Sequence, residues 1–101
     1  MAQFDIYRNT NESTASLIPY LIDAQHEFHE SLGTRLVIPL IRDMRQVEGL
    51  YLPFEIEGEV LYAAVPEMGS VLLETLGERT GTLSERSSEL INAIDFLVTG
   101  F

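Results

Sequence analysis

Apolar and polar side chains alternate in short runs through much of the chain, with the period of two that is typical of β-strands. Residues 3–8 (QFDIYR) place their apolar side chains on one face, so we expect a half-buried strand there. In residues 17–25 (LIPYLIDAQ), a proline lacks the backbone N–H that a sheet needs, and the strand is therefore predicted to begin at Tyr20. Residues 34–40 (TRLVIPL) predict another strand, in which Pro39 marks an edge position or a bulge.

Residues 53–65 (PFEIEGEVLYAAV) contain the clearest hairpin of the sequence. We place its turn at Glu57 and Gly58, because glycine tolerates the backbone conformation that a two-residue turn requires. The residues expected to share one buried face across this hairpin are Phe54, Ile56, Val60 and Tyr62. Residues 68–77 (MGSVLLETLG) predict one further strand, closed by Gly77.

From Leu83 onward the apolar period lengthens to three and four residues, which predicts a C-terminal amphipathic helix. Its apolar stripe consists of Leu83, Leu90, Ile91, Ile94, Leu97 and Val98. Thr82 and Glu85 fit a capping box at the start of the helix, and Ser84 is a rival N-cap. Gly100 can adopt the left-handed conformation that ends a helix.

Ala93 and Phe96 lie off this stripe and would form a second apolar strip, which we expect a two-fold mate to cover. Short strands, a hairpin and one helix predict a mainly β fold, with a small twisted antiparallel sheet or barrel and a C-terminal helix. The length fits one domain, residues 1–101. Because so small a domain is only modestly stable by itself, we expect a homodimer.

The chain is strongly acidic, with sixteen Asp and Glu residues against six basic residues, all of them arginine, and a formal net charge of −10. This charge repels phosphate backbones, so we expect no direct nucleic-acid binding by this chain alone. There is no cysteine, no signal-peptide pattern and no apolar run near the length of about 18 residues that suggests a membrane helix. These features predict a cytoplasmic protein with no membrane contact.

The motif HEFHE, residues 26–30, is the most tempting candidate for chemistry, because His26 and His29 are three positions apart. A zinc-protease helix needs a spacing of four and a third ligand, so we favour a solvated loop and expect no metal. Ser31 has no G-x-S-x-G context for a nucleophile, and no phosphate-binding glycine motif is present. The acidic residues around the hairpin turn are expected to be solubilising charges: Glu55, Glu57 and Glu59. The sequence therefore predicts no catalytic residue and no cofactor, and favours a binding protein over an enzyme.

Five stretches resemble the CcdB family of bacterial toxins, and together they extend along the whole chain. They are QFDIYR (3–8), IDAQHEF (22–28), TRLVIPL (34–40), MGSV (68–71) and INAIDFLVTGF (91–101). The resemblance implies an SH3-like barrel of antiparallel strands with a small extra sheet and a C-terminal α-helix, assembled as a two-fold dimer. This agrees with the strand and helix patterns.

Members of this family are not enzymes: the dimer wedges into the gate of the DNA gyrase A subunit, traps the cleaved gyrase-DNA complex, and is neutralised by the antitoxin CcdA. The resemblance implies that the end of the C-terminal helix and the loop after residues 23–25 contact gyrase. The residues so implied are Phe28, His29, Asp95, Thr99, Gly100 and Phe101. Three of these residues depart from the family pattern. Thr99 stands where some members have a tryptophan, His29 stands where the family has an aliphatic residue, and Phe101 stands in place of the usual isoleucine. Such exchanges of apolar area can shift affinity by about 1 to 2 kcal/mol each.

Two alternative functions remain open from the sequence. A MazF/Kid-type endoribonuclease toxin shares the barrel and dimer, but it would need a basic groove, and the six arginines form no dense cluster in sequence. A non-toxic CcdB-like interaction module would keep the fold and a CcdA-like partner without poisoning gyrase.

Overall fold

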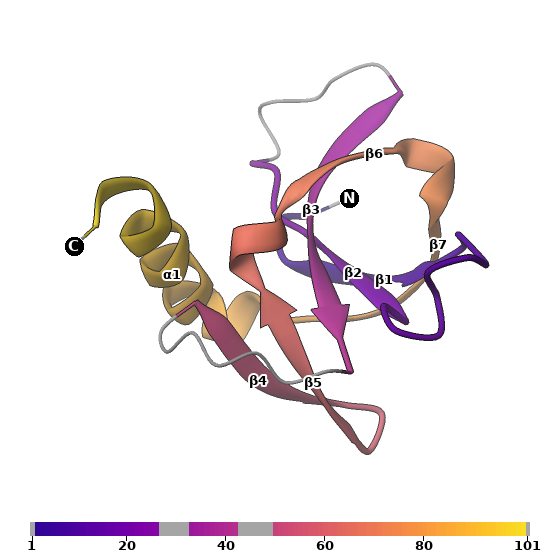
Figure 1. The fold of residues 1–101 in the computed structure, drawn as a ribbon, viewed down its shortest axis with the longest axis horizontal. Helices are drawn as coiled ribbons and strands as arrows, with labels where there is room; N and C mark the ends of the chain where they lie inside the picture. Colours follow the sequence, from indigo (N-terminus) through magenta and orange to yellow (C-terminus); the bar gives the residue numbers. More distant parts are fainter. Residues whose placement is uncertain (1, 27–32, 43–49, 101) are drawn as a thin grey trace.

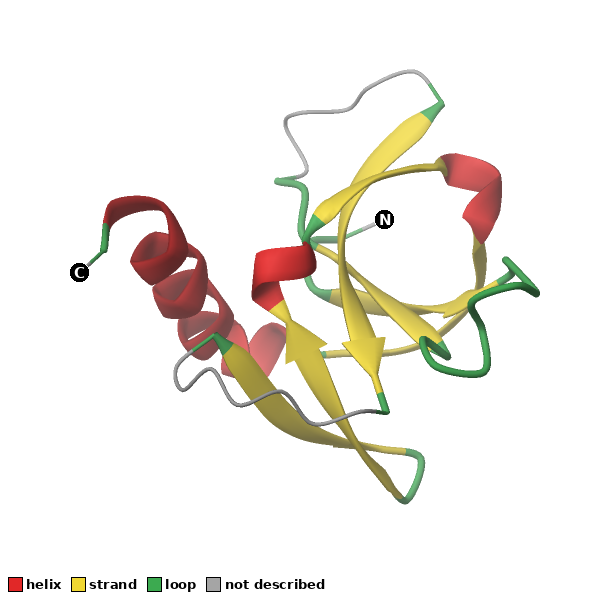
Figure 2. Ribbon diagram, viewed as in Figure 1, coloured by secondary structure: helices red, strands yellow, loops and turns green. Residues whose placement is uncertain are grey.

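The computed structural model describes residues 2–26, 33–42 and 50–100, which form a mostly β structure with one C-terminal helix. The strands are β1 (Asp5–Asn9), β2 (Tyr20–Asp23), β3 (Thr34–Ile41), β4 (Tyr51–Ile56), β5 (Glu59–Ala64), β6 (Gly69–Leu72) and β7 (Leu76–Thr82). The helices are α1 (Ser87–Thr99) and three 3₁₀ turns, η1 (Val65–Glu67), η2 (Leu73–Thr75) and η3 (Ser84–Arg86). The predicted fold class is confirmed (Figure 2).

All described strands are antiparallel and belong to one sheet with the order β4-β5-β3-β2-β1-β7, in which β6 pairs with β3 beside β5. The sheet curls strongly. Figure 1 shows β3, β2, β1, β7 and β6 arranged around a ring, with the β4–β5 hairpin and α1 on the other side of β3. Several neighbouring strands are not consecutive in the chain, because β5 and β6 both pair with β3 and β7 pairs with β1.

Pro39 lies in β3, a central strand, and pairs with Leu21 of β2. The backbone N–H and C=O groups of successive strand residues point alternately to the two neighbouring strands. The Leu36 carbonyl accepts a hydrogen bond from the Ala24 N–H on the β2 side of β3, so the backbone groups of Pro39, three residues further on, point to the other side. On that side β6 pairs with β3 as far as Val37 and β5 begins at Leu40, which leaves Pro39 between them. The missing N–H therefore falls at a break in the ladder inside the sheet, where it costs no hydrogen bond.

The predicted hairpin turn is confirmed, because Glu57 and Gly58 both have positive φ, at 50° and 82°, as a two-residue turn requires. The predicted partners across it are wrong on β5. A two-residue turn puts Phe54 opposite Leu61, and it is Leu61 and Ala63 that are fully buried, whereas Val60 is exposed. The buried face of β5 is therefore formed by residues one position further along the chain than the predicted ones.

Strand β7 was missed by the sequence pattern, which closed the preceding strand at Gly77. Residues 68–77 instead contain β6, the η2 turn and the first part of β7. Gly77 lies within β7, where an added Cβ would come within 2.9 Å of the Thr10 Cγ2 atom and 3.2 Å of the Arg8 carbonyl. Glycine is therefore needed here for close packing of β7 against β1, and it does not end a strand.

The sheet buries side chains on both of its faces. The face toward α1 joins Ile6, Ile22 and Ile38 to Leu90 of the helix in one apolar cluster. On the alternate face, inside the ring, Asp5 and Tyr7 are also buried. The expectation of a half-buried first strand is therefore wrong, because the curl of the sheet encloses the face that a flat sheet would leave in water.

The helix α1 starts later than predicted, at Ser87, after the η3 turn. The Thr82 hydroxyl accepts a hydrogen bond from the Ser84 amide, and the capping box with Glu85 does not start α1, whose N-cap is Arg86 without a side-chain cap. The predicted end is confirmed: Gly100 has a φ of 79° and its N–H donates to the Phe96 carbonyl at 2.9 Å.

Four residues of α1 differ from their predicted roles, whereas Phe96 is 42% exposed, as expected for the outer strip. Ala93, expected on an outer strip with Phe96, is buried in the core beside Leu90. Ile91, Leu97 and Val98, expected in the buried stripe, are 43%, 39% and 74% exposed. The buried line of the helix is thus rotated toward Ala93, and exposed apolar side chains remain on both of its flanks, with Phe96 on one and Ile91 and Val98 on the other.

Candidate binding surfaces

The end of α1 forms an exposed tip. Asp95, Thr99 and Gly100 are all exposed, and the first two lie one turn apart on the same face of the helix. The Thr99 hydroxyl donates to the Asp95 carbonyl at 2.6 Å, so its hydrogen atom is already used and its methyl group remains available for contact. The last turn contains no basic residue, and the helix dipole adds partial negative charge at this end. The tip is therefore suited to a partner that presents apolar and cationic groups.

Three of the six predicted gyrase-binding residues are brought together at this tip: Asp95, Thr99 and Gly100. Phe28, His29 and Phe101 lie outside the described residues. Within the HEFHE motif, His26 is described and lines a groove near α1. In the described ranges, no group of three or more His, Asp or Glu side chains is placed to hold a metal ion.

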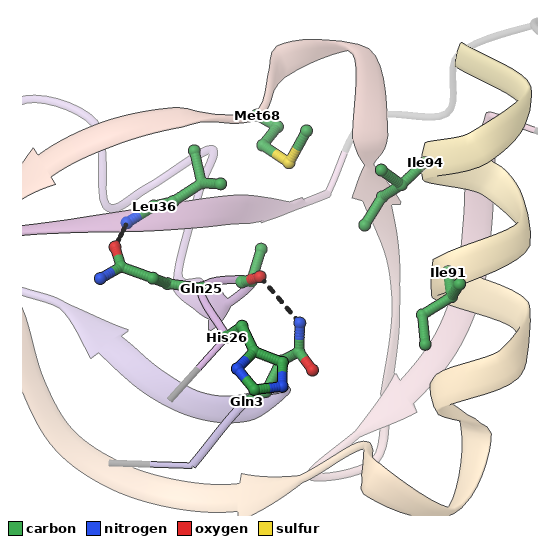
Figure 3. Close-up of a pocket in the computed structure, with 8 residues that line it drawn as sticks. Gln3, Gln25, His26, Leu36, Met68, Ile91 and Ile94 are labelled. Atoms are coloured by element: carbon green, nitrogen blue, oxygen red, sulfur yellow. Dashed lines mark hydrogen bonds between the residues drawn. The ribbon is translucent and has the colours of Figure 1, made fainter. Parts of the chain in front are cut away.

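A groove of about 490 Å³ lies between α1 and the ends of β2 and β3 (Figure 3). Its lining consists of Gln3, Ala24, Gln25, His26, Leu36, Met68, Ile91 and Ile94. The polar side chains in this lining are held by the protein itself: Gln3 Nε2 donates to the Ala24 carbonyl at 3.1 Å, and Gln25 Oε1 accepts from the Leu36 amide at 3.1 Å. The walls that remain are largely apolar. No sequence signal could have identified this groove, because it joins residues from five separate segments.

The exposed apolar residues of α1 continue from this groove. Ile91 and Ile94 form its helical wall, and Val98, one turn further on, is 74% exposed. This strip of Ile91, Ile94 and Val98, here called the α1 strip, carries no charge. The second apolar strip predicted at Ala93 and Phe96 is wrong for Ala93, which is buried, but Phe96 is exposed as expected.

A buried ion pair links two of the sequence motifs. Arg35 at the start of β3 donates from Nε and from a terminal nitrogen to the two carboxylate oxygens of Asp23, at 2.9 and 2.7 Å. Asp23 is 0% exposed and Arg35 is 5% exposed, and the Gln25 amide also donates to Asp23. This pair links the end of β2 to the start of β3. Residue spacing gave no sign of it.

Every arginine in the described ranges is paired with a carboxylate. The pairs are Arg8–Glu57, Arg35–Asp23, Arg42–Glu59, Arg79–Asp5 and Arg86–Glu89. Glu57 and Glu59, expected to be purely solubilising, therefore tie the hairpin turn to neighbouring elements. Arginines neutralised in this way leave little positive charge to attract RNA phosphates, which disfavours the endoribonuclease alternative.

The Asp5–Arg79 pair makes stability depend on pH. Burial raises the pKa of Asp5, but hydrogen bonds from Arg79, Thr82 and the Ala2 amide outweigh it, so the pKa is lowered overall. A lowered pKa in the folded state stabilises the protein above the unfolded pKa, and this contribution is lost as the pH falls through the folded pKa. We expect Asp5→Asn to be less stable than wild type at neutral pH, with a difference that shrinks below about pH 4 in urea melts. A difference that stays constant down to about pH 2 would contradict this role.

A scan against protein-family models matches residues 3–100 to the family described as CcdB protein. This match covers nearly the whole chain. The protein belongs to the CcdB family. CcdB proteins are non-enzymatic toxins of toxin-antitoxin systems that target DNA gyrase, so membership agrees with the resemblance seen in the sequence motifs. In the described part of this CcdB-family chain, no helix is long and apolar enough to span a membrane.

Proposed function

We propose that this chain is a gyrase poison that binds the gyrase A subunit and holds the cleaved gyrase-DNA complex open. The observation that carries the proposal is the CcdB family match over residues 3–100, together with the exposed tip of α1. Asp95, Thr99 and Gly100 form the described part of the contact, and Phe28, His29 and Phe101 complete it. Since gyrase acts on chromosomal and plasmid DNA, the toxin works in the bacterial cytoplasm.

The test is a supercoiled-plasmid assay with purified gyrase and ATP, in which the products are released with detergent and protease. A gyrase poison produces linear DNA that depends on the toxin. Cleavage of RNA without gyrase would instead support the endoribonuclease alternative, and neither activity would support a non-toxic interaction module. The RNA arm needs a substrate digested by a known ribonuclease as its positive control.

The proposal includes a homodimer, and the α1 strip with the adjoining groove supports it. Two copies of a chain with a net charge of −10 repel each other, so a stable seam needs uncharged apolar surface. Ile91, Ile94 and Val98 supply such a surface, and the groove can receive side chains from the mate. This seam replaces the one first expected at Ala93 and Phe96.

Ile91→Glu is expected to convert the dimer to monomers, because it places a desolvated carboxylate at the seam of both copies. Sedimentation at concentrations on the order of 10 µM should then report the monomer mass of 11.4 kDa. Ser88→Glu is the matched control, since it adds the same charge at an exposed position on the polar face of α1. A wild-type protein that is monomeric under these conditions, or an Ile91→Glu dimer, would refute the seam.

A CcdA-like antitoxin is the second proposed partner. Its binding segment is expected to order on contact, which lets a short chain cover a broad site at the cost of ordering entropy. Because the toxin is acidic and its described arginines are already paired, the cognate segment should carry local positive charge or bind chiefly through apolar anchors.

A further inference from the structure

The inside of the ring contains a second pocket, separate from the groove at α1. It has a volume of about 310 Å³, and its apolar surface comes from Ile18, Leu21, Val37, Pro39 and Val71. This volume is at the lower end of the range for ligand pockets, and it suits one apolar side chain better than a whole cofactor. Its lining comes from β1, β2, β3 and β6 and from the segments next to them, and Figure 1 shows these four strands around one ring with β7.

The wall next to the chain segment between β1 and β2 is held in place by its own hydrogen bonds. The Asn9 amide donates to the Thr14 hydroxyl and to the Ile18 carbonyl, both at 2.9 Å. The Thr10 hydroxyl donates to the Thr75 carbonyl at 3.0 Å, beside the end of the β1–β7 pairing. The pocket is therefore preformed, and a ligand does not have to order this wall.

Strand β6 forms one side of this pocket and has an unpaired edge. On β3, Val37 is opposite Gly69 and Leu36 is opposite Ser70. Because the backbone groups of Leu36 point to β2, it is those of Val37 that point to β6. The N–H groups of Gly69 and Val71 therefore point toward β3, whereas those of Ser70 and Leu72 point away from it. Within the described ranges, no backbone hydrogen bond to the N–H of Ser70 or Leu72 is present. Such an edge can accept an added strand.

The charge around the pocket is negative. Glu67 is part of the lining and accepts a hydrogen bond from the Tyr51 hydroxyl at 3.1 Å, and no arginine of the described ranges pairs with it. Glu74, next to the lining residue Thr75, is exposed and likewise has no ion pair with a described arginine. A cationic group on a ligand would therefore be favoured here.

We infer that β6 and the ring pocket form a docking site for an extended basic peptide. The peptide adds to the free edge of β6 as a strand, inserts one leucine-sized or phenylalanine-sized side chain into the pocket, and presents an arginine or lysine to Glu67. Main-chain hydrogen bonds supply the register and the pocket selects the anchor. The site lies away from the tip of α1 and does not depend on gyrase binding.

The test is an NMR titration of the ¹⁵N-labelled protein with the capped peptide Arg-Thr-Leu-Thr-Arg. We expect saturable shifts at the amides of Ser70, Val71 and Leu72. Three altered peptides remove one feature each: alanine in place of leucine, glutamate in place of both arginines, and N-methylation of the central backbone amides. Each change should weaken binding by about fivefold or more, the change expected from losing about 1 kcal/mol.

Two protein variants complete the test. Ser70→Pro removes an N–H that makes no ladder bond, so it should weaken peptide binding about fivefold while the melting temperature stays close to wild type. Glu67→Gln keeps an acceptor for Tyr51 but removes the charge, and it should weaken binding about threefold at low salt. Glu55→Gln, an exposed carboxylate on β4, is the matched control and should bind like wild type.

Three results would overturn the inference. The first is an absence of saturable shifts up to about 5 mM peptide, a concentration above the weakest affinity that such contacts should give. The second is a set of shifts confined to the groove at Met68, Ile91 and Ile94. The third is a change in the amide chemical shifts of Ser70 and Leu72 when the protein concentration alone is raised, which would show that a second copy occupies this edge.

Discussion

Deleting Gly100 and Phe101 is expected to abolish gyrase poisoning while leaving the fold intact. Gly100 is exposed, and its N–H bond to the Phe96 carbonyl ends α1 without adding to the apolar core. An apolar residue that is exposed in the free toxin and buried in the complex contributes to binding far more than to folding. Loss of an aromatic hot spot costs at least about 2 kcal/mol, which weakens gyrase binding roughly thirtyfold or more.

The measurement is a melting curve beside a gyrase pull-down and the plasmid cleavage assay. Asp95→Ala is a milder probe of the same tip, for which we expect a smaller loss. Glu85→Ala, an exposed change in the η3 turn before α1, is the control and should behave like wild type in all three assays. If the truncated chain unfolds, Phe101 belongs to the core; if it poisons gyrase fully, the tip has no part in the mechanism.

Leu90→Ala is expected to lower the free energy of unfolding by about 2 to 5 kcal/mol. Leu90 is 0% exposed and belongs to the cluster that joins α1 to the sheet, so the change removes apolar contacts and leaves a cavity. For a domain of this size, a loss of that order is a large fraction of the total stability. Urea melts at equal protein concentration measure it, because the proposed dimer would make the apparent stability depend on concentration.

Val60→Ala is the matched control, since Val60 is apolar but 53% exposed on β5. We expect it to cost less than about 1 kcal/mol. A loss below about 1 kcal/mol for Leu90→Ala would show that the buried line of α1 is assigned to the wrong face. Ile94, which is half-buried and packs against the same cluster, should give an intermediate value.

Several features were predictable because they depend on neighbouring residues in the chain. The turn at Glu57 and Gly58, the start of β2 at Tyr20 and the end of α1 at Gly100 all follow from local backbone preferences. The mainly β class followed in the same way from the alternation of apolar and polar residues. The family followed from sequence motifs, which can be recognised in a single sequence. The group of Asp95, Thr99 and Gly100 was implied by the resemblance to the family, and all three residues are exposed at the end of α1.

Other features depend on residues that are distant in sequence, and only the folded chain could decide them. Strand β7 has two glycines and few apolar residues, so it carries little local signal and exists because it pairs with β1. The curl of the sheet buries Tyr7 on the face opposite the main core, and the position of α1 on the sheet decides that Ala93 is buried and Ile91 is exposed. The Asp23–Arg35 pair, the groove and the ring pocket likewise join separate segments. Local pattern sets the period of a strand or helix, but tertiary packing selects which of its faces are covered, because burial depends on what the rest of the chain places against each face.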